Sequence, residues 1–167
     1  MSPSSNLSSH PIHHPDWLTP PEPWVVVGVC LGANLGNPRH QLADARRLLE
    51  AIPATRAWRW SSMVESEPVG CSEVQPVYVN QVGVAHACCP VETLFEAMQQ
   101  IEAQLGRVRH VGERNAPRCM DIDLLFYGEH RCDTPHLTLP HPRMHLRPFV
   151  LLLLAELYQE KETPANV

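Results

Sequence analysis

The chain has 167 residues, 44% of them hydrophobic, which is typical of one globular domain with a packed core. Its formal net charge of -5, from 18 acidic and 13 basic side chains, argues against a nucleic-acid-binding surface, which usually carries excess Lys and Arg. The longest apolar run, residues 149–155, is too short to span a bilayer, and no secretory signal is evident at the N-terminus. The cysteines lack CxxC spacing, which favours free thiols in a reducing compartment. We therefore expect a cytoplasmic protein that binds neither nucleic acid nor membrane.

The first 23 residues differ in composition from the rest of the chain. Residues 1–23 are rich in Ser, Pro and His and hold almost nothing to bury, so we expect a disordered N-terminal tail. Residues 24–167 are expected to form a single domain.

The first elements of that domain are a strand and a helix. Residues 24–31 form a β-branched apolar run, typical of a buried strand. Asn37 is a suitable helix cap, Pro38 suits the first helical turn, and Pro53 closes the element. Apolar residues recur at helical spacing between them, at Leu42, Ala45, Leu48, Leu49 and Ile52.

The later segments complete a mixed pattern. We expect strands near residues 58–64 and 77–85, a helix over 90–106, a strand over 120–127 and a last helix over 148–158. The chain between the last two is expected to be irregular. The order strand, helix, strand, strand, helix, strand predicts a ferredoxin-like α+β fold, βαββαβ, with helices packed on an antiparallel sheet and a C-terminal helix.

Asp121 and Asp123 are the first chemically informative pair. On a strand, positions i and i+2 point to the same face, so the two carboxylates lie side by side. A hard divalent cation such as Mg²⁺ would relieve their repulsion. The alternative is a solvated strand edge with no ligand.

A basic loop precedes this pair. Five of the 13 basic residues lie between 107 and 131, and four of them precede the pair, at Arg107, Arg109, Arg114 and Arg118. Guanidinium groups bind phosphate oxygens in a bidentate way and remain charged. Arginines beside paired carboxylates are typical of a polyphosphate–metal site, although a solvated basic loop is the simpler alternative.

Two further motifs are weak by themselves. Residues 137–143 (LTLPHPR), with Arg147, offer a hydroxyl, an imidazole and guanidinium groups in a proline-bounded turn, but their histidines could equally be surface residues. The GANLG segment at 32–36 lacks the Lys-Ser/Thr ending of a phosphate loop, so we interpret its glycines as turn formers.

Together these segments resemble the 6-hydroxymethyl-7,8-dihydropterin pyrophosphokinase family. The resemblance covers about residues 24–158, and its motifs appear in family order. They are LGANLGNP at 31–38, ESEPVG at 65–70, QPVYVN at 75–80, QQIEAQLGRVR at 99–109, ERNAPRCMDIDLLFYG at 113–128 and LTLPHPRMHLRPFVL at 137–151. The resemblance implies a ferredoxin-like fold and transfer of pyrophosphate from ATP to the pterin, which releases AMP in folate biosynthesis.

The resemblance also implies roles for individual residues. Asp121 and Asp123 match the pair that binds two Mg²⁺ ions, and with Arg107 and Arg118 they match the catalytic set. The ATP site corresponds to Gln99, Glu102, Arg109, Arg118, Leu124, Thr138, His141 and Arg147. The pterin pocket corresponds to Ser66, Val69, Tyr78, Asn80 and Phe149.

The residue types fit these roles. A flat pterin ring could stack between Tyr78 and Phe149, and its amide-like edge needs donors and acceptors such as Asn80. The expected partners are small molecules, ATP and the pterin, and the expected state is a monomer. Two other readings stay open: a catalytically silent ferredoxin-like ligand-binding module, and an interaction domain that uses an exposed sheet edge.

Overall fold

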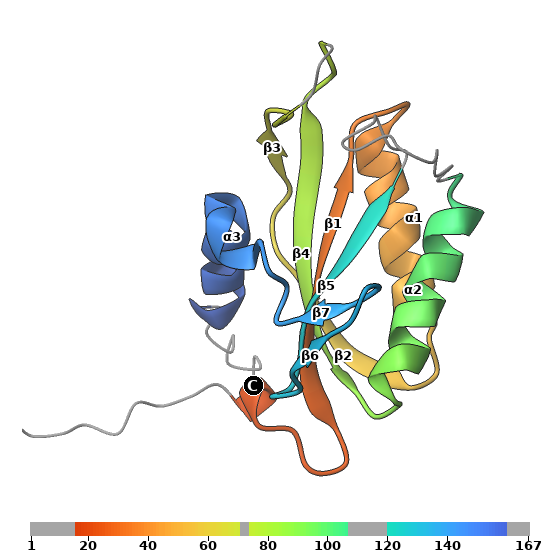
Figure 1. The fold of residues 1–167 in the computed structure, drawn as a ribbon, viewed down its shortest axis with the longest axis vertical. Coiled ribbons are helices and arrows are strands. Elements are labelled where there is room, and N and C mark those ends of the chain that lie inside the picture. Colours follow the sequence, from red (N-terminus) through yellow and green to blue (C-terminus); the bar gives the residue numbers. More distant parts are fainter. Residues whose placement is uncertain (1–15, 71–73, 107–119, 160–167) are drawn as a thin grey trace, which may run out of the picture.

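The protein is an α+β domain built on an antiparallel sheet (Figure 1), seen in a computed structural model that describes residues 16–70, 74–106 and 120–159. The strands are β1 (Val25–Ala33), β2 (Thr55–Trp60), β3 (Val64–Ser66), β4 (Tyr78–Ala87), β5 (Asp121–Tyr127), β6 (Cys132–Asp133) and β7 (Thr138–Leu139). The helices are α1 (Pro38–Glu50), α2 (Val91–Gln104) and α3 (Pro148–Gln159), with short 3-10 helices at Asp16–Leu18 and Met144–Leu146. The sheet order is β2-β4-β1-β5, β3 also pairs with β4, and β6 and β7 form a separate two-stranded ribbon.

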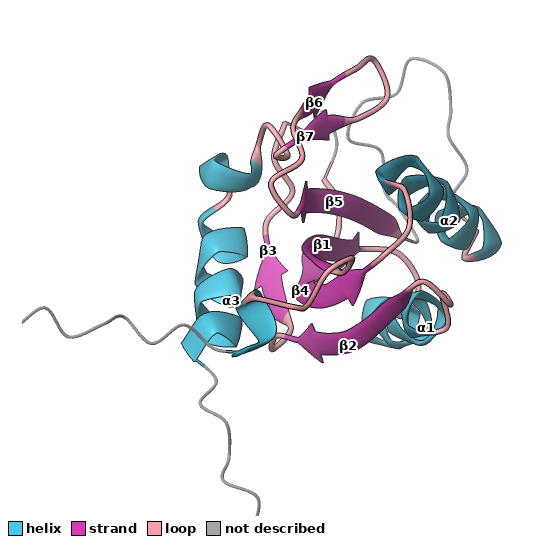
Figure 2. Ribbon diagram, turned by 90° about the horizontal axis from the view of Figure 1, so that it is seen from below, coloured by secondary structure: helices cyan, strands magenta, loops and turns pink. Residues whose placement is uncertain are grey.

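Helices cover both faces of the sheet. In Figure 2, α1 and α2 lie on one side and α3 lies on the other. The central strands β1 and β4 are therefore buried along nearly their whole length. Burial on both faces explains why the sequence of β1 is continuously apolar rather than alternating.

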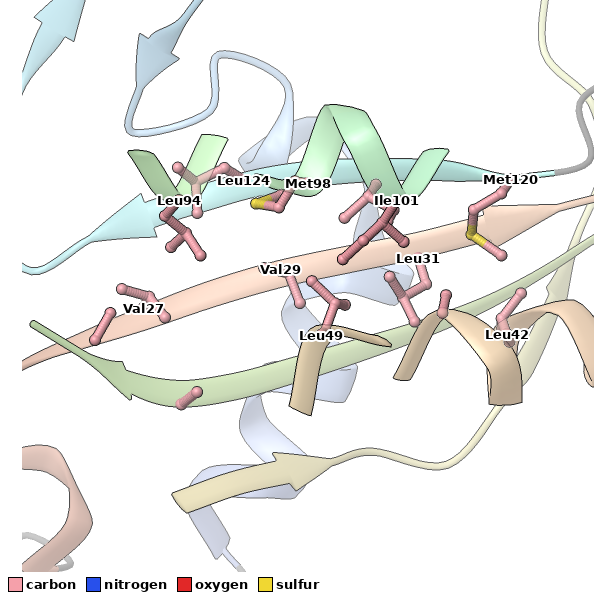
Figure 3. Packing of buried hydrophobic residues seen from close by; sticks show 14 of the residues in the cluster. Val27, Val29, Leu31, Leu42, Leu49, Leu94, Met98, Ile101, Met120 and Leu124 are labelled. Carbon is pink, nitrogen blue, oxygen red and sulfur yellow. The ribbon is translucent and has the colours of Figure 1, made fainter. Parts of the chain in front are cut away.

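The larger hydrophobic core lies between the sheet and the helices α1 and α2 (Figure 3). Leu42 and Leu49 of α1 and Leu94 and Met98 of α2 are almost completely buried there. Each such side chain contributes about 1.5–3 kcal/mol by leaving water. The predicted apolar stripes on both helices therefore hold the helices against the sheet.

A smaller core holds α3 against the opposite face. Val150, Leu153 and Leu157 of α3 are buried with Cys30, Val82, Val84 and Leu125 of the sheet. This contact fixes the start of α3, which carries Phe149, next to the central strands.

Local signals in the sequence correctly predicted several element ends. The Asn37 side chain caps α1 by accepting a hydrogen bond from the backbone N–H of His40 at 3.2 Å, and Pro38 begins the helix. Gly106 follows α2 with φ of +85°, and Gly36 turns the chain with φ of +64°.

Two expectations about the backbone were wrong. The strand expected over residues 58–64 is divided into β2 and β3, because the Ser61 hydroxyl accepts a hydrogen bond from Val82 N and interrupts regular pairing. The segment after Gly128 contains the β6–β7 ribbon rather than only irregular chain. Most of the predicted tail, residues 1–15, lies outside the described residues; Asp16–Leu18 form a 3-10 helix, and the Trp17 carbonyl lies 2.6 Å from His86 Nε2. No helix in the described ranges is long and apolar enough to cross a membrane.

Candidate active site

Two cavities meet at β5. One, here called the strand cavity, has a volume of about 490 Å³ and is lined by β1, β4, residues 66–70 and the start of α3. The other, here called the edge cavity, has a volume of about 540 Å³ and is lined by α2, β5 and residues 134–143. Four side chains line both cavities and form what we call the common wall: Asp121, Asp123, Arg143 and Arg147.

The alternation of β5 places both carboxylates of the common wall on one face. Asp121 and Asp123 are half-buried, whereas Ile122 between them is buried. In the antiparallel register Asp121 lies opposite Gly32 and Asp123 lies opposite Cys30, and both β1 residues also line the strand cavity. The predicted i, i+2 pair therefore faces the cavities and is not a solvated strand edge.

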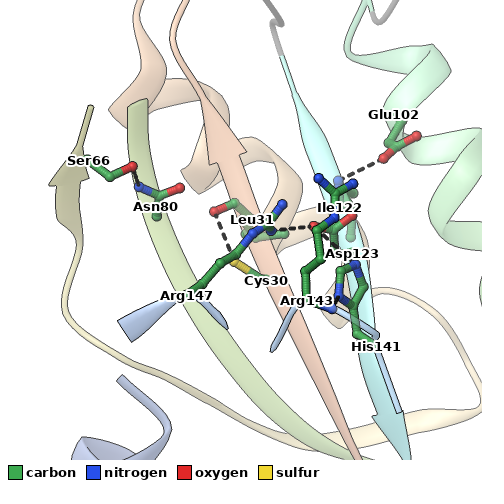
Figure 4. Close-up of polar contacts among 10 residues, drawn as sticks. All are labelled: Cys30, Leu31, Ser66, Asn80, Glu102, Ile122, Asp123, His141, Arg143 and Arg147. Atoms are coloured by element: carbon green, nitrogen blue, oxygen red, sulfur yellow. Dashed lines mark hydrogen bonds and ion pairs between the residues drawn. The ribbon is translucent and has the colours of Figure 1, made fainter. Parts of the chain in front are cut away.

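Arg147 and His141 lie beside Asp123 (Figure 4). Its Oδ2 atom lies 3.0 Å from Arg147 Nη1 and 3.9 Å from His141 Nε2. Burial and the nearby Asp121 raise the pKa of Asp123, while His141 and Arg147 act in the opposite direction. Burial and Asp121 therefore disfavour the ionised form of the Asp123 carboxylate, and Arg147 partly compensates.

His141 has a defined orientation at this wall. Its Nδ1 atom accepts a hydrogen bond from Arg143 N at 3.1 Å, so the proton of the neutral ring is on Nε2, which faces Asp123. Burial lowers the pKa of His141, and Asp123 partly opposes the shift. The imidazole is consequently mostly neutral at pH 7 and offers an N–H donor to the cavity.

The donor set at the common wall fits a hard divalent cation. Asp121 and Asp123 supply carboxylate oxygens, and the raised pKa of Asp123 indicates that added positive charge would be favourable there. Among the described residues, no group of three or more His, Cys, Asp or Glu side chains could enclose a metal ion. Further ligands would therefore come from a bound anion or water, as is usual for Mg²⁺.

The strand cavity contains a fixed amide. Asn80 is 6% exposed, and its Nδ2 donates to Ser66 Oγ at 2.8 Å and to the Val64 carbonyl at 3.4 Å. The structure brings all five residues that the resemblance assigned to the pterin to this cavity, namely Ser66, Val69, Tyr78, Asn80 and Phe149. Val69 is at its open rim, 84% exposed.

The edge cavity receives most of the residues that the resemblance assigned to the nucleotide. The ones that line it are Gln99, Glu102, Leu124, Thr138, His141 and Arg147. Arg107, Arg109 and Arg118 lie outside the described residues. Thr138 Oγ donates to Asp133 at 3.1 Å, and His141 N donates to the Leu125 carbonyl at 2.8 Å, which fixes the 134–143 segment beside β5.

Sequence reasoning gave no site role to several lining residues, among them Cys30, Gly32 and Arg143. Cys30 and Gly32 lie in β1 and face the strand cavity, so Gly32 is not the turn former that was expected. A Cβ atom at Gly32 would lie 3.2 Å from Asn80 Oδ1, which is a tight contact that either atom would have to relieve by a small shift. Arg143 was noted as part of a motif but received no role. The sequence signal that could have identified Cys30 and Gly32 is their i, i+2 spacing, which places two residues of a strand on the same face.

Comparison with known proteins agrees with the resemblance seen in the sequence motifs. The family described as 7,8-dihydro-6-hydroxymethylpterin-pyrophosphokinase (HPPK) matches residues 28–159, which include every residue lining the two cavities. The 2-amino-4-hydroxy-6-hydroxymethyldihydropteridine pyrophosphokinase of Pseudomonas aeruginosa is 39% identical over 138 residues, covering 83% of this chain and 83% of the relative. The enzyme of the same name from Bacillus subtilis is 39% identical over 139 residues, covering 83% and 81%. That of Haemophilus influenzae is 35% identical over 136 residues, covering 81% and 83%.

Proposed function

The chain belongs to the 7,8-dihydro-6-hydroxymethylpterin-pyrophosphokinase family, and we propose that it transfers pyrophosphate from ATP to 6-hydroxymethyl-7,8-dihydropterin in folate biosynthesis. The observation that carries this proposal is the common wall. Two aspartates and two arginines border both a cavity with polar and aromatic lining and a second, more polar one. Such a wall suits a reaction in which a phosphoryl group passes from one bound molecule to the other.

The fold assignment is part of the same proposal. We assign the ferredoxin-like arrangement, in which the four main strands are β1, β2, β4 and β5. The order β2-β4-β1-β5 with antiparallel pairing supports it, as do α1 and α2 on one face.

The pterin is assigned to the strand cavity. Tyr78 and Phe149 supply aromatic faces for a flat ring, and the amide of Asn80 supplies hydrogen-bonding atoms for its polar edge. The bond from Asn80 Nδ2 to Ser66 Oγ supports a fixed amide orientation, with Oδ1 on the Gly32 side as an acceptor. A fixed acceptor selects ligands that carry an N–H donor at that position.

ATP is assigned to the edge cavity. Its phosphates would lie toward Asp121, Asp123 and Arg147, and its nucleoside toward α2 and the 134–143 segment. Arg147 provides a permanent positive charge for phosphate oxygens at the boundary with the pterin cavity. Arg107, Arg109 and Arg118 stay predicted phosphate-binding or catalytic residues, because they lie outside the described ranges.

The proposed chemistry is a single displacement. The pterin hydroxymethyl oxygen attacks the β-phosphorus of ATP and forms a new O–P bond. The bond from that phosphorus to the oxygen bridging the α-phosphate breaks, AMP leaves with this oxygen, and the hydroxyl proton is lost to solvent. The chain's own residues align the two substrates and balance charge, and no covalent enzyme intermediate is required.

Mg²⁺ is proposed as the metal that Asp121 and Asp123 hold. When bound, it neutralises phosphate oxygens and polarises the β-phosphorus. The predicted number of two ions, the monomeric state and the cytoplasmic location stay predictions.

The test is AMP formation from ATP with Mg²⁺, measured with and without 6-hydroxymethyl-7,8-dihydropterin. We expect pterin-dependent AMP release by the wild type and its near loss in Asp123→Ala. Asp44→Asn is the matched control, because Asp44 is a surface carboxylate on α1 outside both cavities. That variant should retain wild-type turnover.

Two outcomes would change the conclusion. Pterin binding without AMP release by the wild type would indicate a catalytically silent ligand-binding relative. Absence of binding of both ligands would contradict the assignment and leave an interaction domain.

A further inference from the structure

We propose that Glu102 acts as a positioning residue that holds the backbone between the two metal-binding aspartates, an inference that rests on the proposed function. Glu102 lies in the last turn of α2, and its Oε1 accepts a hydrogen bond from the backbone N–H of Ile122 at 2.7 Å (Figure 4). Ile122 is the residue between Asp121 and Asp123. This role differs from the direct nucleotide contact that the resemblance implied for Glu102.

The edge position of β5 creates the need for such a contact. β5 is the last strand of the sheet order, so one of its sides has no neighbouring strand in the five-stranded sheet. Ile122 lies opposite Leu31 of β1, yet its N–H donates to Glu102. A backbone N–H buried beside a helix needs an acceptor, because an unsatisfied buried donor is costly. Glu102 supplies the acceptor that a further strand would otherwise provide.

The burial of this pair makes the contact strong. Glu102 is 4% exposed and Ile122 is 5% exposed. A short bond from an N–H to a carboxylate in a poorly hydrated place is stronger than a neutral hydrogen bond. The contact therefore resists displacement of β5 away from its observed position.

The location of the bond links it to the chemistry. A shift of the Ile122 amide moves the backbone on both sides, and with it the carboxylates of Asp121 and Asp123. A misplacement of about 1 Å in a catalytic group reduces rates by roughly 10²-fold. Glu102 thus affects turnover through the aspartates without touching the transferred group.

A direct metal role for Glu102 has no support in this geometry. Although Glu102, Asp121 and Asp123 all line the edge cavity, no three acidic, His or Cys groups among the described residues are arranged to hold a metal ion. Oε1 of Glu102 is directed at the Ile122 amide instead. The carboxylate acts here as a hydrogen-bond acceptor, and the length of the glutamate side chain brings it to the Ile122 amide.

Two variants of Glu102 separate the effect of side-chain length from the effect of charge. Glu102→Gln keeps the length and an acceptor oxygen but removes the charge, whereas Glu102→Asp keeps the charge but shortens the side chain by one methylene. Glu96→Gln, an exposed position on the same helix and outside both cavities, is the control. Three quantities are measured for each: hydrogen exchange of the Ile122 amide in the ligand-free protein, pterin-dependent AMP release, and affinity for AMP without Mg²⁺.

We expect Glu102→Asp to accelerate exchange of the Ile122 amide by about tenfold or more and to lower kcat/KM by roughly 10- to 100-fold. Glu102→Gln, which keeps the length and an acceptor oxygen but loses the charge, should show a smaller increase in exchange and a smaller loss of kcat/KM than Glu102→Asp. Glu96→Gln should stay within about threefold of wild type in both quantities. The affinity for AMP without Mg²⁺ should be unchanged in all three variants, because the inferred contact is with β5 and not with the nucleotide.

The inference is overturned if Ile122 exchange is the same in Glu102→Asp as in wild type. It is also overturned if Glu102→Gln loses turnover while Glu102→Asp keeps it, or if AMP affinity falls in parallel with turnover. Failure of the proposed function is distinguishable from these results. Wild-type protein without pterin-dependent AMP release would refute the function, whereas the exchange measurement on ligand-free protein would still decide whether Glu102 holds the strand.

Discussion

The strand cavity and the edge cavity share a wall but are built from different parts of the fold. The strand cavity uses side chains from the long central strands β1 and β4, which are covered on both faces by hydrophobic cores. The edge cavity uses an edge strand, the end of a helix and the chain around a ribbon of two-residue strands. Fixed atoms on central strands suit discrimination of a small flat ring, while the charged edge suits a larger anionic ligand.

The polar contacts follow the same division. In the strand cavity the side chain of Asn80 is held by neighbouring Ser66 and Val64, within paired strands. In the edge cavity, the Glu102 side chain and the His141 backbone N–H bond to the backbone of β5 from a helix and a loop instead of a paired strand. Changes to one cavity should therefore affect one ligand, and changes to the common wall should affect transfer between them.

The largest effect is expected at the common wall. Asp121→Asn should reduce kcat by about 10²- to 10³-fold, because it removes a charge that balances the transferring group and its metal. Pterin affinity, measured by calorimetry on the same protein, should remain within about threefold of wild type. If the variant lost pterin affinity to the same extent as kcat, this would contradict the proposed role of the common wall in pyrophosphate transfer.

A change to the amide of the strand cavity should separate the two ligands. Asn80→Ala is expected to weaken pterin binding by roughly 10- to 100-fold, since it removes a buried and oriented hydrogen-bonding group. ATP affinity should stay within about twofold of wild type. Ser66→Ala, which removes only the partner of Asn80, should weaken pterin binding less, by about three- to tenfold. Equal losses for both ligands would show that the cavities are not independent.

A glycine substitution tests the space beside that amide. Gly32→Ala adds a Cβ atom 3.2 Å from Asn80 Oδ1, which forces a displacement of a few tenths of an ångström. We expect pterin binding to weaken by about three- to tenfold, with little change in thermal stability or ATP affinity. Titration of each ligand against the purified variant checks this. Unchanged pterin affinity would exclude a role for Asn80 Oδ1 in recognition.

The smallest effect concerns stability and pH. Because burial raises the folded-state pKa of Asp123, folding stability falls as pH rises from its ordinary pKa through the raised value. Asp123→Asn removes this titration, so it should raise Tm at neutral pH by roughly 1–3 °C while impairing turnover. The gain should disappear as pH falls toward the ordinary Asp pKa. Glu129→Gln, at an exposed carboxylate after β5, serves as the control, and a lower Tm for Asp123→Asn at pH 7 would refute the expectation.

The parts of the fold that depend on local chemistry were predictable. Asn37 and Pro38 mark the start of α1 by capping and by a fixed φ, which act within one helical turn. The shared face of Asp121 and Asp123 follows from the two-residue period of a strand. These signals need no knowledge of distant residues, and the structure agrees with them.

The missed features depend on contacts between distant segments. The break between β2 and β3 results from Ser61 bonding to Val82, 21 residues away. The tight space beside Gly32 arises from its pairing with Asn80 in β4. The bond from Ile122 to Glu102 joins a strand to a helix, and no periodicity within either segment indicates it.

The contact between Arg147 and Asp123 has a consequence for how the site changes its charge. The guanidinium is a resident counter-ion for Asp123, at 3.0 Å, and it borders both cavities. If Asp123 held a divalent cation, as proposed, Arg147 would lose part of this contact and its guanidinium would be available to phosphate oxygens. Arg147 would thus exchange one anionic partner for another, which would limit the build-up of charge at the common wall.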